Sequence, residues 1–208
     1  LEAVSRKQSQ PLGAERDGIN LGEAAVLFVV TPERGGVQLT GVGESSDAHH
    51  ISAPCPDGSG AEAAMRGALA SAGRAPGEID YINLHGTATP LNDAMESLAI
   101  SRLFGADADS DTGSDIDHAR LPAVSSTKAL TGHTLGACGA LEAWIAIEMM
   151  RDGWFHGTAN LTSLDPRCAQ LDYLTGAGRE IETDTVMSNN FAFGGINTSL
   201  ILRRWQGE

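Results

Sequence analysis

Three apolar segments of this 208-residue chain each end in a cluster of polar and small residues. The clusters lie at 85–90 (HGTATP), 125–133 (SSTKALTGH) and 189–195 (NNFAFGG). Apolar runs of strand length that end in this way are typical of strands buried inside a layered sheet. Alternation of such strands with helical segments predicts an α/β fold. We expect the three clusters to form parts of one catalytic pocket.

The hydrophobic pattern predicts the order of the elements. Strands are expected at 23–30, 37–42, 79–84, 121–125, 173–174, 185–189 and 198–202, and helices at 62–72, 93–104 and 136–150. The first two strands are expected to form a hairpin through Gly35-Gly36, with 23–30 buried on both faces. Asn92 is the expected N-cap of the second helix. The third helix is apolar almost all round, which indicates a central position. No linker divides residues 1–208 into domains.

Composition excludes several classes of protein. The formal net charge of −13 and the pI of about 4.7 argue against a nucleic-acid partner and against docking to an anionic membrane. The three cysteines indicate no disulfide framework and no zinc-ligand pattern, so we expect a cytoplasmic protein. Apolar residues make up 41% of the chain, yet no apolar run approaches the length of a membrane-spanning helix.

An acidic segment at about 105–119 is expected to be an exposed, mobile loop. A calcium-binding module is the competing interpretation. Counted from Asp107, however, the glycine and glutamate that an EF-hand requires are replaced by Thr112 and His118. The pair His49-His50 has no third ligand nearby in the sequence, so we expect surface histidines and no metal site there.

The three clusters carry groups that can handle a carbonyl and its developing negative charge. His85 and His133 can donate hydrogen bonds from their rings, and a backbone N–H at the Phe193 turn can serve an oxyanion hole. A buried Lys128 needs a partner, and Glu142 in the following helix is placed to supply it. Taken singly, each motif also has a structural interpretation: a core histidine, a helix-capping histidine with a surface lysine, or an ordinary strand turn.

Taken together, in this order and spacing, the motifs resemble those of the β-ketoacyl-acyl-carrier-protein synthases, the ketosynthases of the thiolase superfamily. The family pattern is His-Gly-Thr-x-Thr, then a lysine before Gly-His, then Asn-x-Phe-Gly-Phe-Gly-Gly. Segments 16–18 and 22–24 are similar to the family's entry into its second half, and 185–189 most resembles the bacterial elongating enzymes. Ala88 and Ala192 depart from the pattern by small changes.

The resemblance implies a thiolase-like layered α-β-α-β-α fold, of which residues 1–208 are the C-terminal half only. It implies decarboxylative Claisen condensation of an acyl thioester with malonyl-carrier protein, in fatty acid, polyketide or aryl polyene biosynthesis. The implied catalytic residues are His85, His133, Lys128, Glu142 and Phe193. The implied substrate-binding residues are Thr87, Thr89, Phe191, Gly194 and Gly195. No cofactor is implied beyond phosphopantetheine on the carrier protein, but Asn83, Glu142, Ser188 and Asn189 resemble positions around a structural monovalent cation in some relatives.

The family's nucleophilic cysteine lies in the N-terminal half. Cys55, Cys138 and Cys168 all lack the sharp strand-to-helix turn that such a nucleophile needs. We therefore expect the isolated chain to be inactive. Its expected partners are an N-terminal ketosynthase half and an acyl carrier protein, within a homodimer or heterodimer. The alternative is a non-catalytic subunit similar to a chain length factor.

Overall fold

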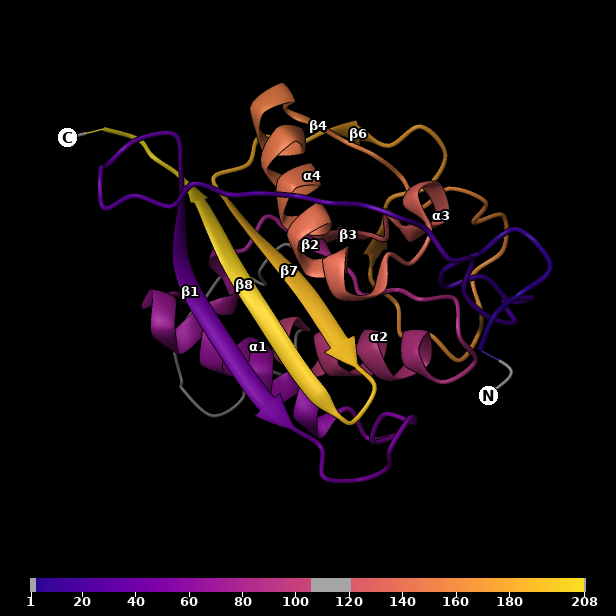
Figure 1. Ribbon diagram of the computed structural model, residues 1–208. Coiled ribbons are helices and arrows are strands. Elements are labelled where there is room, and N and C mark those ends of the chain that lie inside the picture. Colours follow the sequence, from indigo (N-terminus) through magenta and orange to yellow (C-terminus); the bar gives the residue numbers. More distant parts are fainter. Residues whose placement is uncertain (1–2, 106–120, 208) are drawn as a thin grey trace.

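A six-stranded mixed sheet forms the centre of the molecule in the computed structural model, which describes residues 3–105 and 121–207. The strand order is β1-β8-β7-β2-β3-β5 (Figure 1). These strands are β1 (Val37–Ser46), β8 (Ile196–Arg204), β7 (Thr185–Ala192), β2 (Tyr81–Asn83), β3 (Ala123–Ser125) and β5 (Asp172–Tyr173). The β1–β8 and β8–β7 pairs are antiparallel, and the other pairs are parallel. Strands β4 (Trp154–Phe155) and β6 (Arg179–Glu180) form a separate antiparallel pair.

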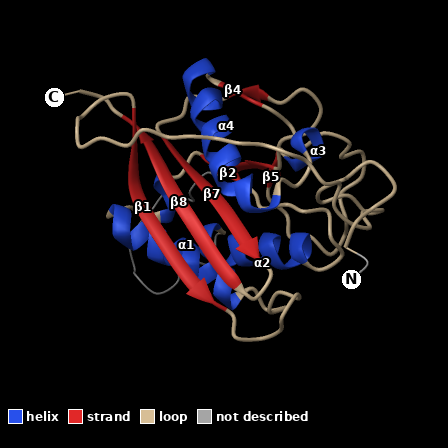
Figure 2. Cartoon of the chain, viewed as in Figure 1, coloured by secondary structure: helices blue, strands red, loops and turns tan. Residues whose placement is uncertain are grey.

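Helices cover the two faces of the sheet (Figure 2). Helices α1 (Ser59–Ala72) and α2 (Asn92–Phe104) pack on one face, and α4 (Cys138–Asp152) packs on the other. The alternation of side chains along β2 illustrates this division, because Ile82 faces α1 and α2 whereas Tyr81 faces α4. The short helix α3 (Lys128–Thr131) follows β3 directly.

Glycines in β1 allow α1 to lie close against the sheet. A Cβ atom at Gly43 would collide with the Ala64 carbonyl, and one at Gly41 would collide with the Ala68 carbonyl. Glycine is needed where another backbone approaches a strand so closely. Helix α1 ends at Gly73, whose φ of 62° is the left-handed conformation of a helix C-cap.

The expected strand at 23–30 is wrong in this structure. Residues 24–30 form no backbone–backbone hydrogen bond within the described part of the chain. They run as an extended segment that crosses in front of α4 in the view of Figure 1. Leu27, Val29 and Val30 are 91%, 84% and 81% exposed. The hairpin with 37–42 is wrong as well, because β1 pairs with β8 instead. A strand needs a backbone partner, and the apolar run alone does not supply one.

The other expected elements are present with shifted ends. Strands 37–42, 185–189 and 198–202 are longer than expected, and the inner strands 79–84 and 121–125 are shorter. Asn92 is the first residue of α2 and not its N-cap, since its side chain donates to Asp93 and Glu96. Helix α4 leaves Trp144 47% exposed, so it is central on one side only. Residues 106–119 of the acidic segment, including the candidate calcium positions, lie outside the described residues. Within residues 3–105 and 121–207, no helix is both long enough and apolar enough to span a bilayer.

Candidate active site

His85 follows the carboxyl end of β2, at the start of a tight loop. Gly86 has φ 39°, and Ala88 adopts the left-handed region at φ 63°, which is uncommon for a residue with a side chain. Ser126 Oγ donates to the Gly86 carbonyl at 2.8 Å, so the end of β3 fixes this loop from one side. The His85 side chain is 5% exposed and forms part of a cavity wall.

His133 is held by the segment near the N-terminus. Its backbone N–H donates to the Asn20 carbonyl at 2.7 Å, and its carbonyl accepts from Gly22 N at 3.1 Å. Gly132, with φ 71°, turns the chain out of α3 and places the imidazole. The His133 Nδ1 atom accepts from Leu135 N at 3.1 Å, which puts the proton of a neutral ring on Nε2.

The two imidazoles meet although 47 residues separate them in the sequence. Their ring centroids lie 5.5 Å apart at an interplanar angle of 89°, and the Phe191 ring lies 5.9 Å from that of His85. All three contribute to a cavity of about 620 Å³, which Thr87, Thr89, Cys138, Asn190 and Phe193 also line. The three sequence clusters therefore converge on one cavity.

Both histidines are kept neutral near neutral pH. Burial, assisted by the positive charge of Lys128, lowers the pKa of His133 to about 4. Burial, Lys128 and His133 hold the pKa of His85 well below its usual range. A neutral imidazole offers one N–H donor and one acceptor nitrogen. The pair can therefore donate hydrogen bonds to an oxygen placed between them without carrying a proton charge.

Lys128 and Glu142 form a buried ion pair behind the histidines. The side chains are 2% and 1% exposed, and Nζ contacts Oε1. Burial is the largest single influence and opposes the charge of Lys128, but Glu142, Cys138 and Glu96 together outweigh burial and raise the pKa of the lysine. The expectation that these two residues pair is confirmed. Neither lines the cavity, so they act on the histidines through their field and their packing.

The Phe191–Gly195 turn is only partly placed as expected. Phe191 and the 59%-exposed Phe193 both line the cavity. Gly194 and Gly195, expected to bind substrate, do not line it. Their amides donate instead to the Ile51 and Ala192 carbonyls, at 2.9 and 3.2 Å.

Thr87 and Thr89 lie side by side on the cavity wall. Their hydroxyl oxygens are 2.9 Å apart in a hydrogen bond, and both residues line the cavity. One hydroxyl proton is committed to this bond, which leaves the pair one further donor and several acceptor lone pairs. Such a pair can hold a polar amide chain that enters the cavity.

The candidate cation ligands only partly share one face of the sheet. Asn83 and Ser188 are neighbours across β2 and β7, and alternation along the strands puts them on the α4 face with Tyr81 and Val186. Both side-chain polar atoms of Asn83, the Ser188 hydroxyl and Glu142 Oε2 are buried without a hydrogen-bond partner among the described residues. Asn189 points to the opposite face, where its Nδ2 lies 3.4 Å from Met65 Sδ. Its side chain is therefore not part of this set.

The cysteines differ in their surroundings. Cys138 lines the cavity at the start of α4, and burial raises the pKa of its thiol. Burial also raises the pKa of Cys168, to about 11, whereas Cys55 lies in the loop that follows β1. All three thiols are free. No group of three or more His, Cys, Asp or Glu side chains that could hold a metal ion is present in residues 3–105 and 121–207.

Four residues of the site escaped sequence reasoning. Asp47 and Asn197 line the cavity and contact each other, but 150 positions separate them and no local pattern links them. Asp93 and Glu96 are buried carboxylates of α2 that accept hydrogen bonds from the backbone of His85 and of the loop that follows it. Their position on the helical face that also carries Leu103 was a signal that could have revealed them.

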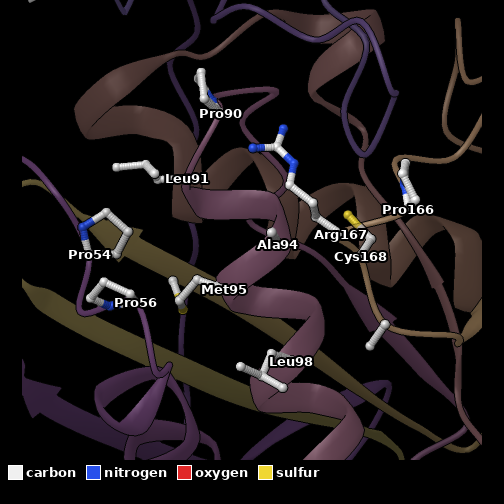
Figure 3. A pocket seen from close by; sticks show the side chains of 11 residues that line it. Pro54, Pro56, Pro90, Leu91, Ala94, Met95, Leu98, Pro166, Arg167 and Cys168 are labelled. Atoms are coloured by element: carbon white, nitrogen blue, oxygen red, sulfur yellow. The ribbon is translucent and has the colours of Figure 1, made fainter.

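A second cavity of about 470 Å³ lies beside α2 (Figure 3). Pro54, Pro90 and Leu91 belong to both cavities, so they form a wall between them. The wall of the second cavity is mostly proline and aliphatic side chain. Its cation, Arg167, is already paired with Asp165, which accepts from the guanidinium at 2.7 Å. This cavity brings together no groups for acid–base chemistry.

Comparison with known proteins links this geometry to one family. Residues 37–162 match the family model described as "Beta-ketoacyl synthase, C-terminal domain". The chain is 43% identical over 206 residues to 3-oxoacyl-[acyl-carrier-protein] synthase 2 of Coxiella burnetii, with 95% of this chain and 47% of that protein covered. The corresponding protein of Rhizobium meliloti is 40% identical, with 97% and 47% covered.

Solved structures also resemble the chain. A ketosynthase of Xenorhabdus doucetiae, solved with its chain length factor, superposes with a TM-score of 0.87 at 44% identity, covering 98% of this chain and 48% of its own. A β-ketoacyl synthase of Burkholderia phymatum gives a TM-score of 0.82 at 40% identity, with 98% and 49% covered. The chain thus spans about half the length of the relatives it matches.

Proposed function

Because the chain belongs to the family of β-ketoacyl synthase C-terminal domains, we propose that it is the C-terminal half of a 3-oxoacyl-acyl-carrier-protein synthase. The complete enzyme joins an acyl thioester to malonyl-carrier protein by decarboxylative Claisen condensation. The observation that carries the proposal is the meeting of two neutral imidazoles, His85 and His133, at one cavity.

The chemistry follows from those imidazoles. The thioester oxygen of the malonyl group accepts hydrogen bonds from His85 and from His133 Nε2. The bond to the carboxylate carbon breaks, CO₂ leaves, and the electron pair moves into an enolate whose negative oxygen the two donors stabilise. The enolate carbon then attacks the acyl thioester on a cysteine of the N-terminal half. A new carbon–carbon bond forms, and that thiolate leaves.

Neutral donors suit this step. An imidazole that was already protonated could transfer its proton to the enolate carbon and end the reaction without condensation. Burial and the Lys128 charge, which lower the pKa of both histidines, disfavour that outcome. The Phe193 amide is the proposed oxyanion donor for the second, acyl-group carbonyl. The Gly194 and Gly195 amides are unsuited to that task because they are already bonded.

The proposed partner that completes the site is an N-terminal ketosynthase half. Residues 24–30 have the extended backbone and the apolar side chains of a buried strand, yet they lie outside the matched domain and are exposed except for the half-buried Ala24 and Val26. A sheet edge in the N-terminal half is the backbone partner proposed for this segment. The partly exposed Trp144 of α4 gives the same partner an apolar helix face to cover.

An acyl carrier protein is the proposed source of both substrates. One structural relative, at 25% identity and a TM-score of 0.81, is a ketosynthase with a type II polyketide synthase acyl-carrier protein. The Thr87–Thr89 hydroxyl pair is the proposed contact for the phosphopantetheine arm, which carries amide groups that need such partners. We place the complete enzyme in the cytoplasm, where free thiols such as the three here persist.

A monovalent cation is the proposed occupant of the space between β2, β7 and α4. Asn83, Ser188 and Glu142 offer it buried oxygen atoms that have no hydrogen-bond partner among the described residues, which is the donor chemistry that hard cations prefer. Asn189 is not a side-chain ligand in this proposal. The ion would fix Glu142 and hence the Lys128 charge behind the histidines.

The test is reconstitution of this chain with an N-terminal ketosynthase half, followed by His133→Ala and His85→Ala. Release of ¹⁴CO₂ from carboxyl-labelled malonyl-carrier protein is measured together with acylation of the N-terminal cysteine. We expect both variants to lose about 10²-fold or more in CO₂ release while acylation of the cysteine persists. A variant with unchanged CO₂ release would contradict the proposal and would favour the non-catalytic subunit similar to a chain length factor.

A further inference from the structure

Two buried carboxylates of α2 lie beneath the loop that carries His85. Asp93 and Glu96 are both 0% exposed, and neither is part of the proposed condensation chemistry. Both point toward backbone N–H groups of that loop. Burial of a carboxylate costs free energy, which hydrogen bonds to such amides offset. The two carboxylates and the loop therefore depend on each other.

Glu96 holds the backbone of His85 with both oxygens. Its Oε1 accepts from His85 N and its Oε2 from Gly86 N, each at 2.8 Å. On the other side of the loop, the Gly86 carbonyl accepts from Ser126. The peptide that carries the imidazole is thus fixed between a carboxylate of α2 and a hydroxyl at the end of β3.

Asp93 has a different set of partners. It accepts from Ala88 N at 3.1 Å and from Leu12 N at 2.7 Å, and Arg16 Nε lies 3.8 Å from its Oδ2. Its negative charge therefore has a nearby counter-charge. Glu96 forms no ion pair within the described residues, and its charge is balanced by the two backbone amides it holds and by Asn92 Nδ2, which lies 3.5 Å from Oε2.

We propose that Glu96 is a positioning residue for His85, and that it positions the loop only in its ionised form. The proposal deepens the proposed condensing function, on which its catalytic readout rests. An ionised carboxylate presents an acceptor to each of the two amides. A protonated carboxyl has a hydroxyl hydrogen at one oxygen, so it opposes one of the two amide donors and weakens that bond.

The ionisation of Glu96 falls within a testable pH range. Burial raises the pKa of Glu96 to about 7, against the two amides, which lower it. The charged and titratable side chains that act on it are Asp93 on its own helix, Lys128 on α3 and Tyr173 on β5, whereas His85 contacts it through its backbone amide. Asp93 raises the pKa of Glu96 further and Lys128 lowers it. As pH falls below 7, we expect the loop to loosen at His85 and Gly86.

The primary experiment needs no mutation. The chain is assembled with an N-terminal ketosynthase half, and hydrogen–deuterium exchange is followed across about pH 5.5–8.5, a range centred on the pKa of Glu96. The rates are corrected for the pH dependence of intrinsic exchange. We expect the His85 and Gly86 amides to lose protection by about tenfold between the alkaline and acidic ends, with a midpoint near 7. Protection of these two amides that does not change with pH would overturn the proposal.

The second experiment compares Glu96→Gln with a matched control, Glu148→Gln, which makes the same change on the exposed side of α4. A glutamine accepts from one amide but presents an N–H to the other. We expect Glu96→Gln to lower kcat about 10- to 100-fold with KM little changed, and to remove the pH dependence of amide protection. The control should match the unmodified enzyme, whereas normal kcat and protection in Glu96→Gln would refute the positioning role.

The two readouts separate this proposal from the proposed function. If the assembled protein fails to condense but the two amides still respond to pH, the positioning role stands and the catalytic assignment fails. If condensation proceeds and the amides ignore both pH and the substitution, the catalytic assignment stands and the positioning role fails. If Glu96→Gln does not fold, the pH series on the unmodified protein decides alone.

Discussion

Asn197 donates from Nδ2 to Asp47 Oδ1 at 2.7 Å and thereby ties β8 to the loop that follows β1. Asp47 makes two further hydrogen bonds. Its N–H donates to the Gly195 carbonyl in the β7–β8 turn at 2.8 Å, and its Oδ2 accepts from Cys55 N in the loop after β1 at 2.9 Å. Through its backbone N–H and its carboxylate, Asp47 thus joins the turn that carries Phe193 to the loop after β1, and both segments line the cavity.

Replacing Asp47 by alanine is the first test of this connection. The change removes the Asn197 and Cys55 bonds together, so we expect a loss of about 1–3 kcal/mol in the free energy of unfolding and faster amide exchange at Gly194 and Gly195. Urea denaturation and hydrogen exchange measure the two effects. Glu44→Ala, an exposed position on β1, is the control. Unchanged exchange in Asp47→Ala would rule out a bracing role.

The buried ion pair predicts a non-additive mutant cycle. Lys128→Met leaves the Glu142 carboxylate buried without its counter-charge, so we expect a loss of about 3–5 kcal/mol in stability. The double variant Lys128→Met/Glu142→Leu should recover part of that loss, because no isolated charge remains. Urea midpoints of the four proteins give the coupling free energy. A double variant as unstable as the sum of the single ones would show that the pair is not coupled.

An exposed pair supplies the matched control for that cycle. Arg151 and Glu148 form an ion pair at the surface of α4. Exposed pairs contribute little, so Arg151→Met should change stability by less than about 1 kcal/mol. The contrast between the two pairs on one helix separates the effect of burial from the effect of charge.

The sequence predicted the residues that line the site better than it predicted the contacts that hold those residues in place. His85, His133, Phe191 and Phe193 could be placed because each stands in a short motif at the end of an apolar run. Glu142 could be paired with Lys128 because a buried lysine demands a partner within reach. The Asp47–Asn197 contact could not be predicted, since it depends on the β1–β8 register and carries no local pattern.

The failure at 23–30 has a physical cause. An apolar run of strand length predicts that a segment is buried, but it does not identify the strand with which the segment pairs. Within residues 3–105 and 121–207, no backbone group pairs with residues 24–30. The pattern supports the proposal above that a sheet edge of the N-terminal half pairs with this segment, whereas the hairpin interpretation assumed a partner in the adjacent sequence.

Cys138 is predicted to remain unacylated in the assembled enzyme. Burial raises the pKa of its thiol, so little of the reactive thiolate exists at neutral pH, although the residue lines the cavity. Incubation with an acyl-thioester donor and peptide mass spectrometry should find the acyl group on a cysteine of the N-terminal half. Cys138→Ala should retain most of the condensing activity. Stoichiometric acylation of Cys138 would overturn the need for a second half.

The orphaned oxygens predict a cation-specific stabilisation. If a monovalent ion binds between Asn83, Ser188 and Glu142, the assembled enzyme should melt at a higher temperature in potassium or sodium chloride than in choline chloride of equal ionic strength. Asn83→Leu should abolish the difference by removing an oxygen ligand. Thr40→Val, at a part-buried position on β1, is the control and should preserve it. Equal melting temperatures in all three salts would exclude a cation at this place.

His133 is predicted to stay neutral, with its proton on Nε2, through mildly acidic pH. Burial and Lys128 lower the pKa of His133 to about 4, so the unfolded chain binds a proton more readily than the folded one between pH 6.5 and 4. Stability should therefore fall as pH drops through that range. The raised pKa of Glu96 changes the stability in the opposite direction over this range. The contribution of His133 is therefore the difference between the slopes of unfolding free energy against pH for the unmodified protein and for His133→Gln. His49→Gln, in an exposed loop, should leave the slope intact.

Nitrogen-15 NMR of labelled histidine reports the tautomer of His133 directly, and a His133 signal that titrates near pH 6.5 would contradict the neutral-donor chemistry.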